Sequence, residues 1–319
     1  DLLTDYALDW LDEQQGRDEP FFLYLSHKAV HSDFDPPERH EGTYGDVTPD
    51  YPPSMKNTES NYRTKPEWVK EQRFSWHGVD YMYHGRTGFD RLYRDYSESL
   101  MALDESIGAV LDRLEENGMA ENTLVIYMGD NGFLLGEHGL IDKRNAYEES
   151  IRVPMLAWAP GTIEPGSTVE SLVRNIDVAP TLFDLTGTSA PSMSMDGTSF
   201  LDLLRDNQSG GADENRAFLY EYYWEHAFPH TPTTFALRGD RFKYVYYHGV
   251  WGLNELYNLE NDPNERHNLI NIPAYQSRVD SMRNRLFDRL EAEGAMSVPF
   301  RRGNWQADDR LMDAGSSPE

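Results

Sequence analysis

Two short apolar runs, residues 21–25 and 123–128, constrain the fold more than any other feature of the sequence. Each run is apolar at consecutive positions, which is typical of strands that are buried on both faces of a sheet. Between them, residues 93–117 carry leucine, isoleucine and valine along one helical stripe, and Gly118 suits a left-handed C-cap. The alternation of buried strands with helices predicts an α/β sandwich with a largely parallel sheet.

The remaining patterns extend this organisation. We expect a helix at residues 2–11, a third strand at residues 154–159 and a helix at residues 177–187. Residues 32–90 are rich in Pro, Gly, Tyr and charge without a sustained period, so we interpret them as a long ordered surface excursion. The C-terminal part predicts a small α+β domain, with β-prone runs and a final helix at residues 218–224, 234–237, 242–247 and 277–293.

Composition excludes several classes of function. A net charge of -26 repels nucleic-acid phosphates, so we expect no nucleic-acid partner. The longest apolar runs are far shorter than the ~20 residues that span a bilayer, and we expect no membrane span. Cysteine is absent, which excludes disulfides, thiolate metal sites and thiol nucleophiles. An anionic substrate would need local positive charge from Lys, Arg or a metal ion.

Polar residues follow the ends of two predicted strands. His31 lies beyond the first strand, and Asp130 and Asn131 end the second. Ligands of open α/β sheets bind beyond the carboxyl ends of strands, so we expect these side chains to face one crevice. Aspartate and asparagine oxygens suit calcium or magnesium, which take about six to eight or about six ligands. Two residues are only part of such a site, and an isolated Asp-Asn-Gly is more often a turn.

Residues 136–154 form a glycine-rich run that carries Lys143, Arg144 and Arg152 into the third predicted strand. Chemistry alone favours a solvated charged loop here. The spacing of this run from residues 130–132 resembles the central signature of the type I, formylglycine-dependent sulfatases. Flanking segments resemble the same family in the same order: residues 20–25 with His31, residues 175–182, and residues 255–259 before Asp262 and Pro263.

The resemblance implies an alkaline-phosphatase-type α/β/α sandwich with a smaller C-terminal α+β domain around an antiparallel sheet. It also implies a secreted or periplasmic protein. The expected parts are the C-terminal portion of the catalytic domain at residues 1–206, a linker at 207–215, the α+β subdomain at 216–306 and a polar tail at 307–319.

The resemblance further implies hydrolysis of sulfate esters on a sulfated saccharide of glycosaminoglycan, mucin or algal type. Asp130 and Asn131 would be two ligands of one calcium ion. Lys143 would contact the sulfate, and His31 would stand near the leaving ester oxygen as an acid. His138 would contact the sugar or the sulfate, although a histidine that only shapes the glycine-rich turn is an equal alternative.

Two features of the family do not precede His31 in this sequence. One is the Cys/Ser-x-Pro-x-Arg region, whose first residue becomes the nucleophile. The other is the aspartate pair that completes the calcium site. We therefore expect a truncated chain that is inactive by itself, either a fragment of a longer sulfatase or a truncated gene product. The alternatives are a phosphatase or phosphodiesterase of the same superfamily, and a non-catalytic saccharide-binding remnant.

Overall fold

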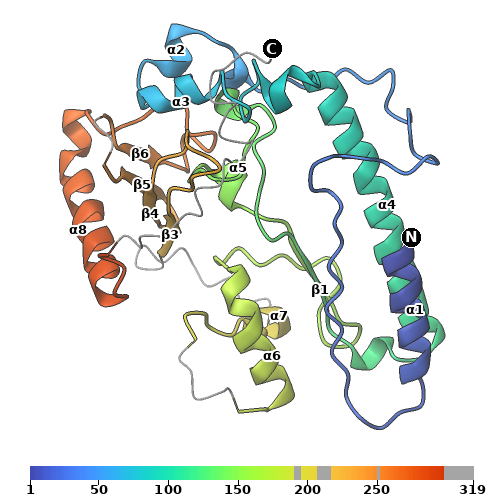
Figure 1. The fold of residues 1–319 in the computed structure, drawn as a ribbon. Helices are drawn as coiled ribbons and strands as arrows, with labels where there is room; N and C mark the ends of the chain where they lie inside the picture. Colours follow the sequence, from blue (N-terminus) through green and yellow to red (C-terminus); the bar gives the residue numbers. More distant parts are fainter. Residues whose placement is uncertain (190–194, 207–216, 250–251, 298–319) are drawn as a thin grey trace. The chain divides into compact units, whose positions relative to one another are not determined.

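A computed structural model describes residues 1–189, 195–206, 217–249 and 252–297. The chain divides into two compact units, each built from three separate stretches of sequence (Figure 1). Unit 1 comprises Asp1–Asp50, Phe89–Met128 and Pro154–Ser209, and unit 2 comprises Tyr51–Gly88, Gly129–Val153 and Gly210–Glu319. Among the helices of the described ranges, none is both long and apolar enough to cross a membrane.

Unit 1 is organised around two long helices, and α1 packs along α4. Their buried faces include Leu11 of α1 and Leu103 of α4, and Thr4 Oγ1 lies 2.8 Å from Ser106 Oγ. Both predicted helices are therefore confirmed, as is the helix predicted near residue 180. The elements of unit 1 are α1 (Leu2–Gln14), α4 (Phe89–Glu116), η3 (Ala120–Asn122), β1 (Val125–Met128), β2 (Met155–Trp158), η5 (Asn175–Asp177), α6 (Val178–Thr186) and α7 (Leu201–Asp206).

The strands of unit 1 pair in the opposite relative direction to the one predicted. β1 and β2 pair antiparallel, with Val125 opposite Trp158 and Met128 opposite Met155. A parallel pair needs a long crossover connection, usually a helix. The residues between these strands, 129–153, contain only a single-turn α-helix and a 3₁₀ turn, so the chain returns antiparallel. The predicted largely parallel sheet is thus wrong for the described residues.

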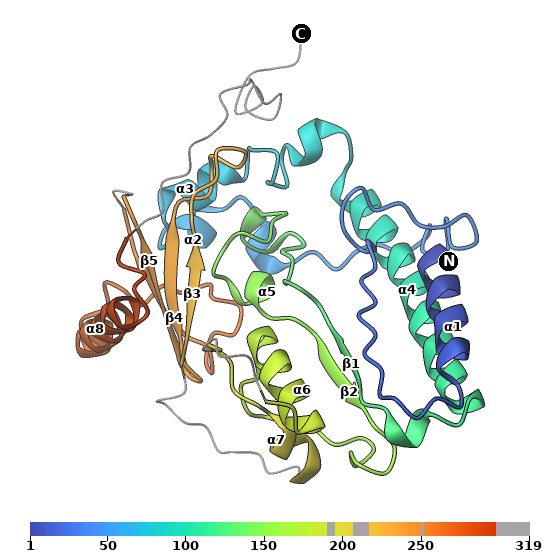
Figure 2. The same ribbon diagram turned by 60° about the horizontal axis from the view of Figure 1, so that its bottom comes forward.

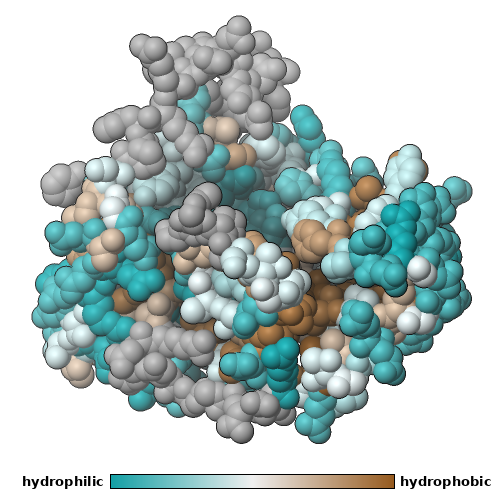
Figure 3. Space-filling view, turned by 90° about the horizontal axis from the view of Figure 1, so that it is seen from below, coloured by the Kyte–Doolittle hydropathy of each residue, from teal (hydrophilic) through white to brown (hydrophobic). Residues whose placement is uncertain are grey.

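The predicted strand at residues 21–25 is extended but is not a strand, because no described segment forms a ladder with it. Phe22 and Tyr24 are 68% and 81% exposed. This segment and α1 line an open apolar groove of about 390 Å³, formed by Leu3, Tyr6, Ala7, Trp10, Phe22, Leu23 and Leu25. Hydrophobic surface, in brown, is also visible on the face drawn in Figure 3.

Unit 2 contains a four-stranded antiparallel sheet in the order β3-β4-β5-β6. The antiparallel sheet and the final helix are confirmed. The predicted boundaries at residues 206 and 216 stay a prediction, because the linker 207–215 and the tail 307–319 lie outside the described residues. The elements of unit 2 are η1 (Pro53–Met55), α2 (Glu59–Tyr62), α3 (Glu67–Gln72), η2 (Met82–Gly85), η4 (Glu137–Gly139), α5 (Glu148–Ile151), β3 (Phe218–Tyr222), β4 (Thr234–Arg238), β5 (Phe242–Tyr247), β6 (Glu255–Asn258), η6 (Pro273–Tyr275) and α8 (Gln276–Ala292).

Both faces of this sheet are covered, which explains why β4, β5 and β6 are buried at nearly every position. Phe235 and Leu237 of β4 pack with Leu286 of α8 on one face. Ala236, which points the other way, belongs to a second cluster with Val69 of α3. Figures 1 and 2 show α8 along one face of the sheet and α5 on the opposite side.

The segment 32–90 is more buried and more helical than expected. Its second half contains α2 and α3, and Trp68 and Val69 lie in the core of unit 2 at 8% and 0% exposure. The prediction of a surface excursion is wrong for these residues. Helices of four and six residues are shorter than the window in which a helical period can be recognised.

Candidate active site

The loop that follows β1 carries Asp130, Asn131 and Lys143 and is closed by hydrogen bonds between its two arms. The Gly132 amide donates to the Ser150 carbonyl at 2.9 Å, and the Leu134 amide donates to the Asp142 carbonyl at 2.8 Å. At the tip, the Gly136 amide donates to the Leu140 carbonyl at 2.9 Å. These bonds hold the segment that begins with Asp130 and the segment that contains Lys143 side by side in a fixed register.

Gly132 allows the two arms to approach closely. A Cβ atom at this position would lie 2.2 Å from the Glu149 carbonyl oxygen and 2.8 Å from that of Arg152. Both obstacles are backbone atoms, which cannot rotate away. The glycine of the Asp-Asn-Gly sequence is therefore required by packing, in addition to its preference for turns.

Asp130 and Asn131 present oxygen donors at the start of this loop. Asp130 is exposed, and one of its carboxylate oxygens accepts the Asn131 amide at 2.9 Å. The Asn131 side chain donates through Nδ2 to the Gly132 carbonyl at 2.7 Å, which fixes the amide and leaves Oδ1 as its acceptor end. A carboxylate and an amide oxygen fit a hard divalent cation in kind. Within the described ranges, no group of three or more His, Asp or Glu side chains could hold a metal ion.

Lys143 lies on the returning arm between two tethered neighbours. Its side chain is half-buried, and among the described residues no ion pair of its ammonium is found. Asp142 is 1% exposed and accepts a hydrogen bond from Arg144 at 2.9 Å. His77 lies beside this pair, with Nδ1 3.8 Å from Asp142. Burial lowers the pKa of His77 to about 4, against the opposing effect of the Asp142 carboxylate.

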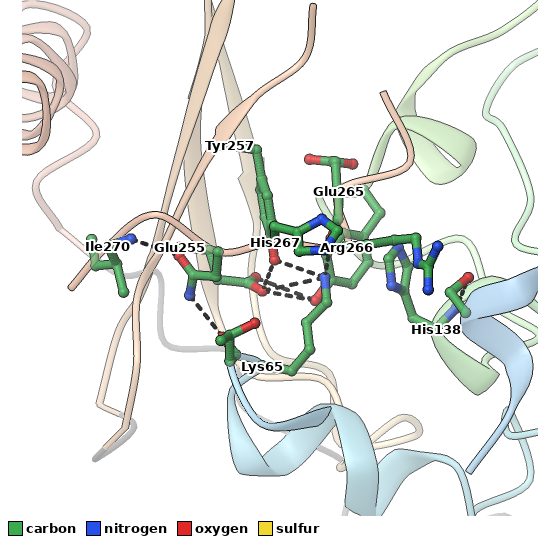
Figure 4. A network of polar contacts seen from close by, with 12 residues as sticks. Lys65, His138, Glu255, Tyr257, Glu265, Arg266, His267 and Ile270 are labelled. Atoms are coloured by element: carbon green, nitrogen blue, oxygen red, sulfur yellow. Dashed lines mark hydrogen bonds and ion pairs between the residues drawn. The ribbon is translucent and has the colours of Figure 1, made fainter. Parts of the chain in front are cut away.

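His138 occupies a buried position rather than a solvent-facing one. It is 3% exposed, adopts a left-handed backbone conformation with φ 56°, and stacks on the Tyr147 ring at 4.1 Å. Burial lowers its pKa well below the usual value, and the nearby cations Lys65, Lys243 and Arg266 act in the same direction. The imidazole is therefore neutral at physiological pH. Figure 4 shows His138 and Arg266 close together at the edge of a buried network.

The centre of that network is Glu255 of β6, whose carboxylate is fully buried (Figure 4). Tyr147, Tyr247 and Tyr257 all donate their hydroxyls to it. Lys65 adds an ammonium 3.6 Å from the carboxylate. Burial, followed by the charge of Glu255, raises the pKa of each tyrosine well above its usual value, so the hydroxyls stay protonated as donors. Tyr147 thus connects the loop after Lys143 to the four-stranded sheet.

A second set of buried charges holds the start of α5. Glu148 accepts hydrogen bonds from Arg238 of β4 and Lys243 of β5 at 3.0 and 3.1 Å. Burial alone would raise the pKa of Glu148, but the two cations outweigh it and hold the pKa at about 2. Glu265 also pairs with Lys243, at 2.7 Å, and burial raises its pKa to about 7. Both cations are distant from Glu148 in sequence, 90 and 95 positions away, so no local pattern indicates these pairs.

The structure brings four of the five predicted site residues into one unit: Asp130, Asn131, His138 and Lys143 belong to unit 2. His31 belongs to unit 1, in a turn after the extended segment 21–25. It is exposed, and its Nδ1 lies 2.9 Å from the Ser32 carbonyl oxygen. A carbonyl only accepts, so Nδ1 carries the proton and Nε2 is the nitrogen that exchanges protons with a ligand.

One sequence signal was missed. Residues 297–301, Ser-Val-Pro-Phe-Arg, fit the Ser-x-Pro-x-Arg pattern, although they follow α8 instead of preceding His31. Ser297 is exposed, and residues 298–301 lie outside the described part of the chain.

Comparisons with known proteins agree with this arrangement. The family model described as Sulfatase matches residues 1–188, and the model described as N-sulphoglucosamine sulphohydrolase, C-terminal, matches residues 136–292. Among curated proteins, an N-acetylglucosamine-6-O-sulfatase of Bacteroides thetaiotaomicron is 28% identical over 329 residues, covering 87% of this chain and 59% of the relative. An N-acetylglucosamine-6-sulfatase of Capra hircus is 35% identical over 207 residues, covering 64% of this chain and 35% of the relative.

Solved structures show the same fold. A protein solved in complex with its substrate, D-glucosamine-2-N,6-O-disulfate, superposes with a TM-score of 0.78 at 25% identity, covering 93% of this chain and 70% of that one. The fold is therefore the α/β fold of the alkaline phosphatase superfamily with a smaller C-terminal sheet. The chain spans 59% of the length of the Bacteroides relative. Because the Sulfatase model matches more than half of its residues, this chain belongs to the sulfatase family, whose members use a metal ion.

Proposed function

We propose that the protein acts as a sulfatase on a sulfated saccharide, and that a 6-O-sulfated glucosamine is the first substrate to test. The observation that carries the proposal is the hydrogen-bonded loop that holds Asp130, Asn131 and Lys143 in one register. A cation-binding pair and an ammonium on one short loop suit an anionic group. The relatives named as N-acetylglucosamine-6-sulfatases support the choice of sugar.

Lys143 would stabilise the sulfuryl group in this proposal. Lys143 is half-buried and lies between the tethered residues Asp142 and Arg144. The sulfate oxygens and the leaving oxygen share negative charge as the ester bond breaks, so a cation positioned beside them lowers the barrier. The same charge also supplies the attraction that an anionic substrate needs against a net charge of -26.

His31 would act as the general acid for the leaving sugar alkoxide. Because Nδ1 is engaged with the Ser32 carbonyl, a proton on Nε2 is the one available for transfer. Hydrolysis of the ester yields the sugar alcohol and sulfate, and the alcohol oxygen must gain one proton. An imidazolium supplies that proton without the formation of a free alkoxide.

Asp130 and Asn131 would hold the metal ion, which we propose to be calcium. Both residues offer hard oxygens, as calcium requires, but calcium takes about six to eight ligands, so others must come from elsewhere. When bound, a divalent cation polarises the sulfate oxygens as a Lewis acid. His138 would contribute by shaping the loop from its buried position or by contacting substrate.

The leaving-group dependence of turnover tests the role of His31. The protein expressed from its complete reading frame is assayed with a sugar sulfate and with nitrophenyl sulfate, whose alcohol is a good leaving group. His31→Ala should lower turnover of the sugar sulfate by roughly 10²–10⁴-fold and affect nitrophenyl sulfate much less. Equal losses on both esters would show that His31 is not the leaving-group acid. Preferred release of phosphate from phosphate esters would favour a phosphatase instead.

A further inference from the structure

Asp142, the residue before Lys143, has a carboxylate that is completely buried and fully engaged. Its Oδ2 accepts hydrogen bonds from Gln72 Nε2 at 2.9 Å and from Asn145 Nδ2 at 3.1 Å. Its Oδ1 accepts from Arg144 Nη1 at 2.9 Å. Three donors from two separate segments therefore converge on one side chain, and its position is determined by all of them.

The backbone around Asp142 is tied as well. The Asp142 carbonyl accepts the Leu134 amide from the opposite arm of the loop, at 2.8 Å. The preceding amide, of Ile141, donates to the His77 carbonyl at 2.7 Å. Leu134 and Ile141 are both 0% exposed, so these bonds lie in a dry environment where they resist exchange with water.

Arg144, on the other side of Lys143, is held by the Asp142 pair and by an aromatic contact. Its guanidinium lies 3.4 Å from the centroid of the Phe228 ring. The ion pair between residues 142 and 144 thus spans Lys143 and fixes the chain before and after it. Lys143 is the half-buried side chain between these two anchored neighbours.

We infer that Asp142 is a positioning residue that fixes where the Lys143 ammonium stands. A lysine ammonium sits on a flexible four-carbon stem, so its location depends on how firmly its backbone is held. Loosening that backbone by even a small displacement degrades a site that relies on exact placement of charge. The inference rests on the proposed function in assuming that the ammonium meets a sulfate.

The chain provides its own reporters for a test that requires no catalysis. It has six lysines, and amine acetylation followed by mass spectrometry can measure the labelling rate of each one. Lys65 and Lys243 are buried and serve as indicators of unfolding, whereas Lys70 is exposed and gives the reference rate. In Asp142→Asn, Lys143 should be acetylated at least about threefold faster relative to Lys70, because its segment opens more often.

The matched control is Asp262→Asn, which removes another carboxylate of unit 2 that accepts backbone amides, from Arg266 and His267. It should leave the relative labelling rate of Lys143 unchanged. If Asp142→Asn unfolds the protein, so that Lys65 and Lys243 become labelled, Asn145→Ala replaces it as the test variant. This change removes only one of the three donors and should give a smaller acceleration of Lys143 acetylation. If Asp142→Asn or Asn145→Ala is folded and has its Lys143 acetylated at the wild-type rate relative to Lys70, the inference is overturned.

A double-mutant cycle separates positioning from a general structural role. In the protein expressed from its complete reading frame, Asp142→Asn should lower kcat/KM for a sulfate ester about tenfold or more, but should cost little in a Lys143→Ala background. Additive losses would overturn the inference and leave the proposed function intact. If Lys143 is labelled faster in Asp142→Asn but the wild-type protein hydrolyses no sulfate ester, the positioning role of Asp142 stands and the proposed function is overturned.

Discussion

The ammonium of Lys243 on β5 lies 3.1 Å from Glu148 Oε1, at the first residue of α5. The same ammonium lies 2.7 Å from Glu265, and both Lys243 and Glu265 have side chains with no exposed surface. One buried cation therefore joins the C-terminal sheet to the short helix that follows the Lys143 loop. This contact makes the loop and the sheet one structural element.

Replacing this cation should be costly. Lys243→Met removes the cation paired with the fully buried Glu265 and leaves Arg238 as the remaining cation at Glu148, and we expect a loss of roughly 3–5 kcal/mol in the free energy of unfolding. Arg241→Met is the matched control, because its pair with Glu260 at 3.0 Å is half exposed or more at both ends. That change should cost less than about 1 kcal/mol. Urea denaturation of both variants measures the two losses. Similar losses in the free energy of unfolding would show that the buried pair is no more stabilising than the exposed one.

His77 should make the protein acid-sensitive. Burial lowers its pKa from 6.5 to about 4, so between these pH values the unfolded chain binds a proton that the folded chain does not. Stability from this group is complete above pH 6.5 and is lost as the pH falls towards 4. The shift corresponds to about 3 kcal/mol. Glu148, with a pKa of about 2, adds a loss below pH 4.5. Glu265, with its pKa raised to about 7, gains stability as the pH falls from 7 to about 4.5 and so opposes the loss from His77.

The measurement is the difference in unfolding free energy between pH 7 and pH 4.5, from urea titrations of wild type and His77→Gln. The variant should lose clearly less stability on acidification than the wild type. His267→Gln, which removes an imidazole with a 76% exposed side chain, should behave like the wild type. Equal acid losses in wild type and His77→Gln would contradict the assignment.

Gly132 should be intolerant of a methyl group. In Gly132→Ala the new Cβ would meet backbone carbonyls at 2.2 and 2.8 Å, and we expect a loss of about 1–3 kcal/mol from overpacking. Gly88 in the same unit has no atom within 4 Å of the corresponding position. Gly88→Ala should be neutral or stabilise by about 0.4–1 kcal/mol. Comparable urea midpoints for the two variants would show that the arms of the loop can separate without cost.

The elements with a long period could be predicted from sequence. The stripe along α4 and the pattern of α8 each extend over several turns, and both helices were recognised. Residues 21–25 show the limit, because an apolar run indicates a strand but contains no information about whether a neighbour is there to pair with it. In the described structure none is, and Phe22 and Tyr24 are exposed.

The candidate site was only partly accessible to sequence reasoning. Asp130 and Lys143 were found because they lie close together in sequence within a recognisable spacing. The contacts that anchor them come from residues such as Gln72 and Lys243, 70 and 95 positions away from Asp142 and Glu148. His138 was expected either to contact the substrate or to shape the glycine-rich turn. Its burial and its stacking on Tyr147 depend on tertiary packing that no local pattern encodes.

The 319 residues expressed alone should hydrolyse no sulfate ester. Attack on sulfur needs an activated nucleophile, and the one described residue of a Ser-x-Pro-x-Arg pattern, Ser297, follows α8 far from the motifs that carry Asp130 and Lys143 in sequence. An assay with nitrophenyl sulfate tests this expectation. Turnover by the isolated chain that disappears in Ser297→Ala would overturn it and identify that serine as the nucleophile.

The central claim is that Lys143 stabilises the sulfate group of a saccharide ester, and sulfate release from N-acetylglucosamine 6-sulfate tests it most directly. The protein from the complete reading frame is assayed in calcium, together with Lys143→Ala and the exposed control Lys70→Ala. We predict sulfate release by the wild type and by Lys70→Ala, with kcat/KM reduced roughly 10²–10³-fold in Lys143→Ala. Sulfate release that is unchanged in Lys143→Ala would contradict the account.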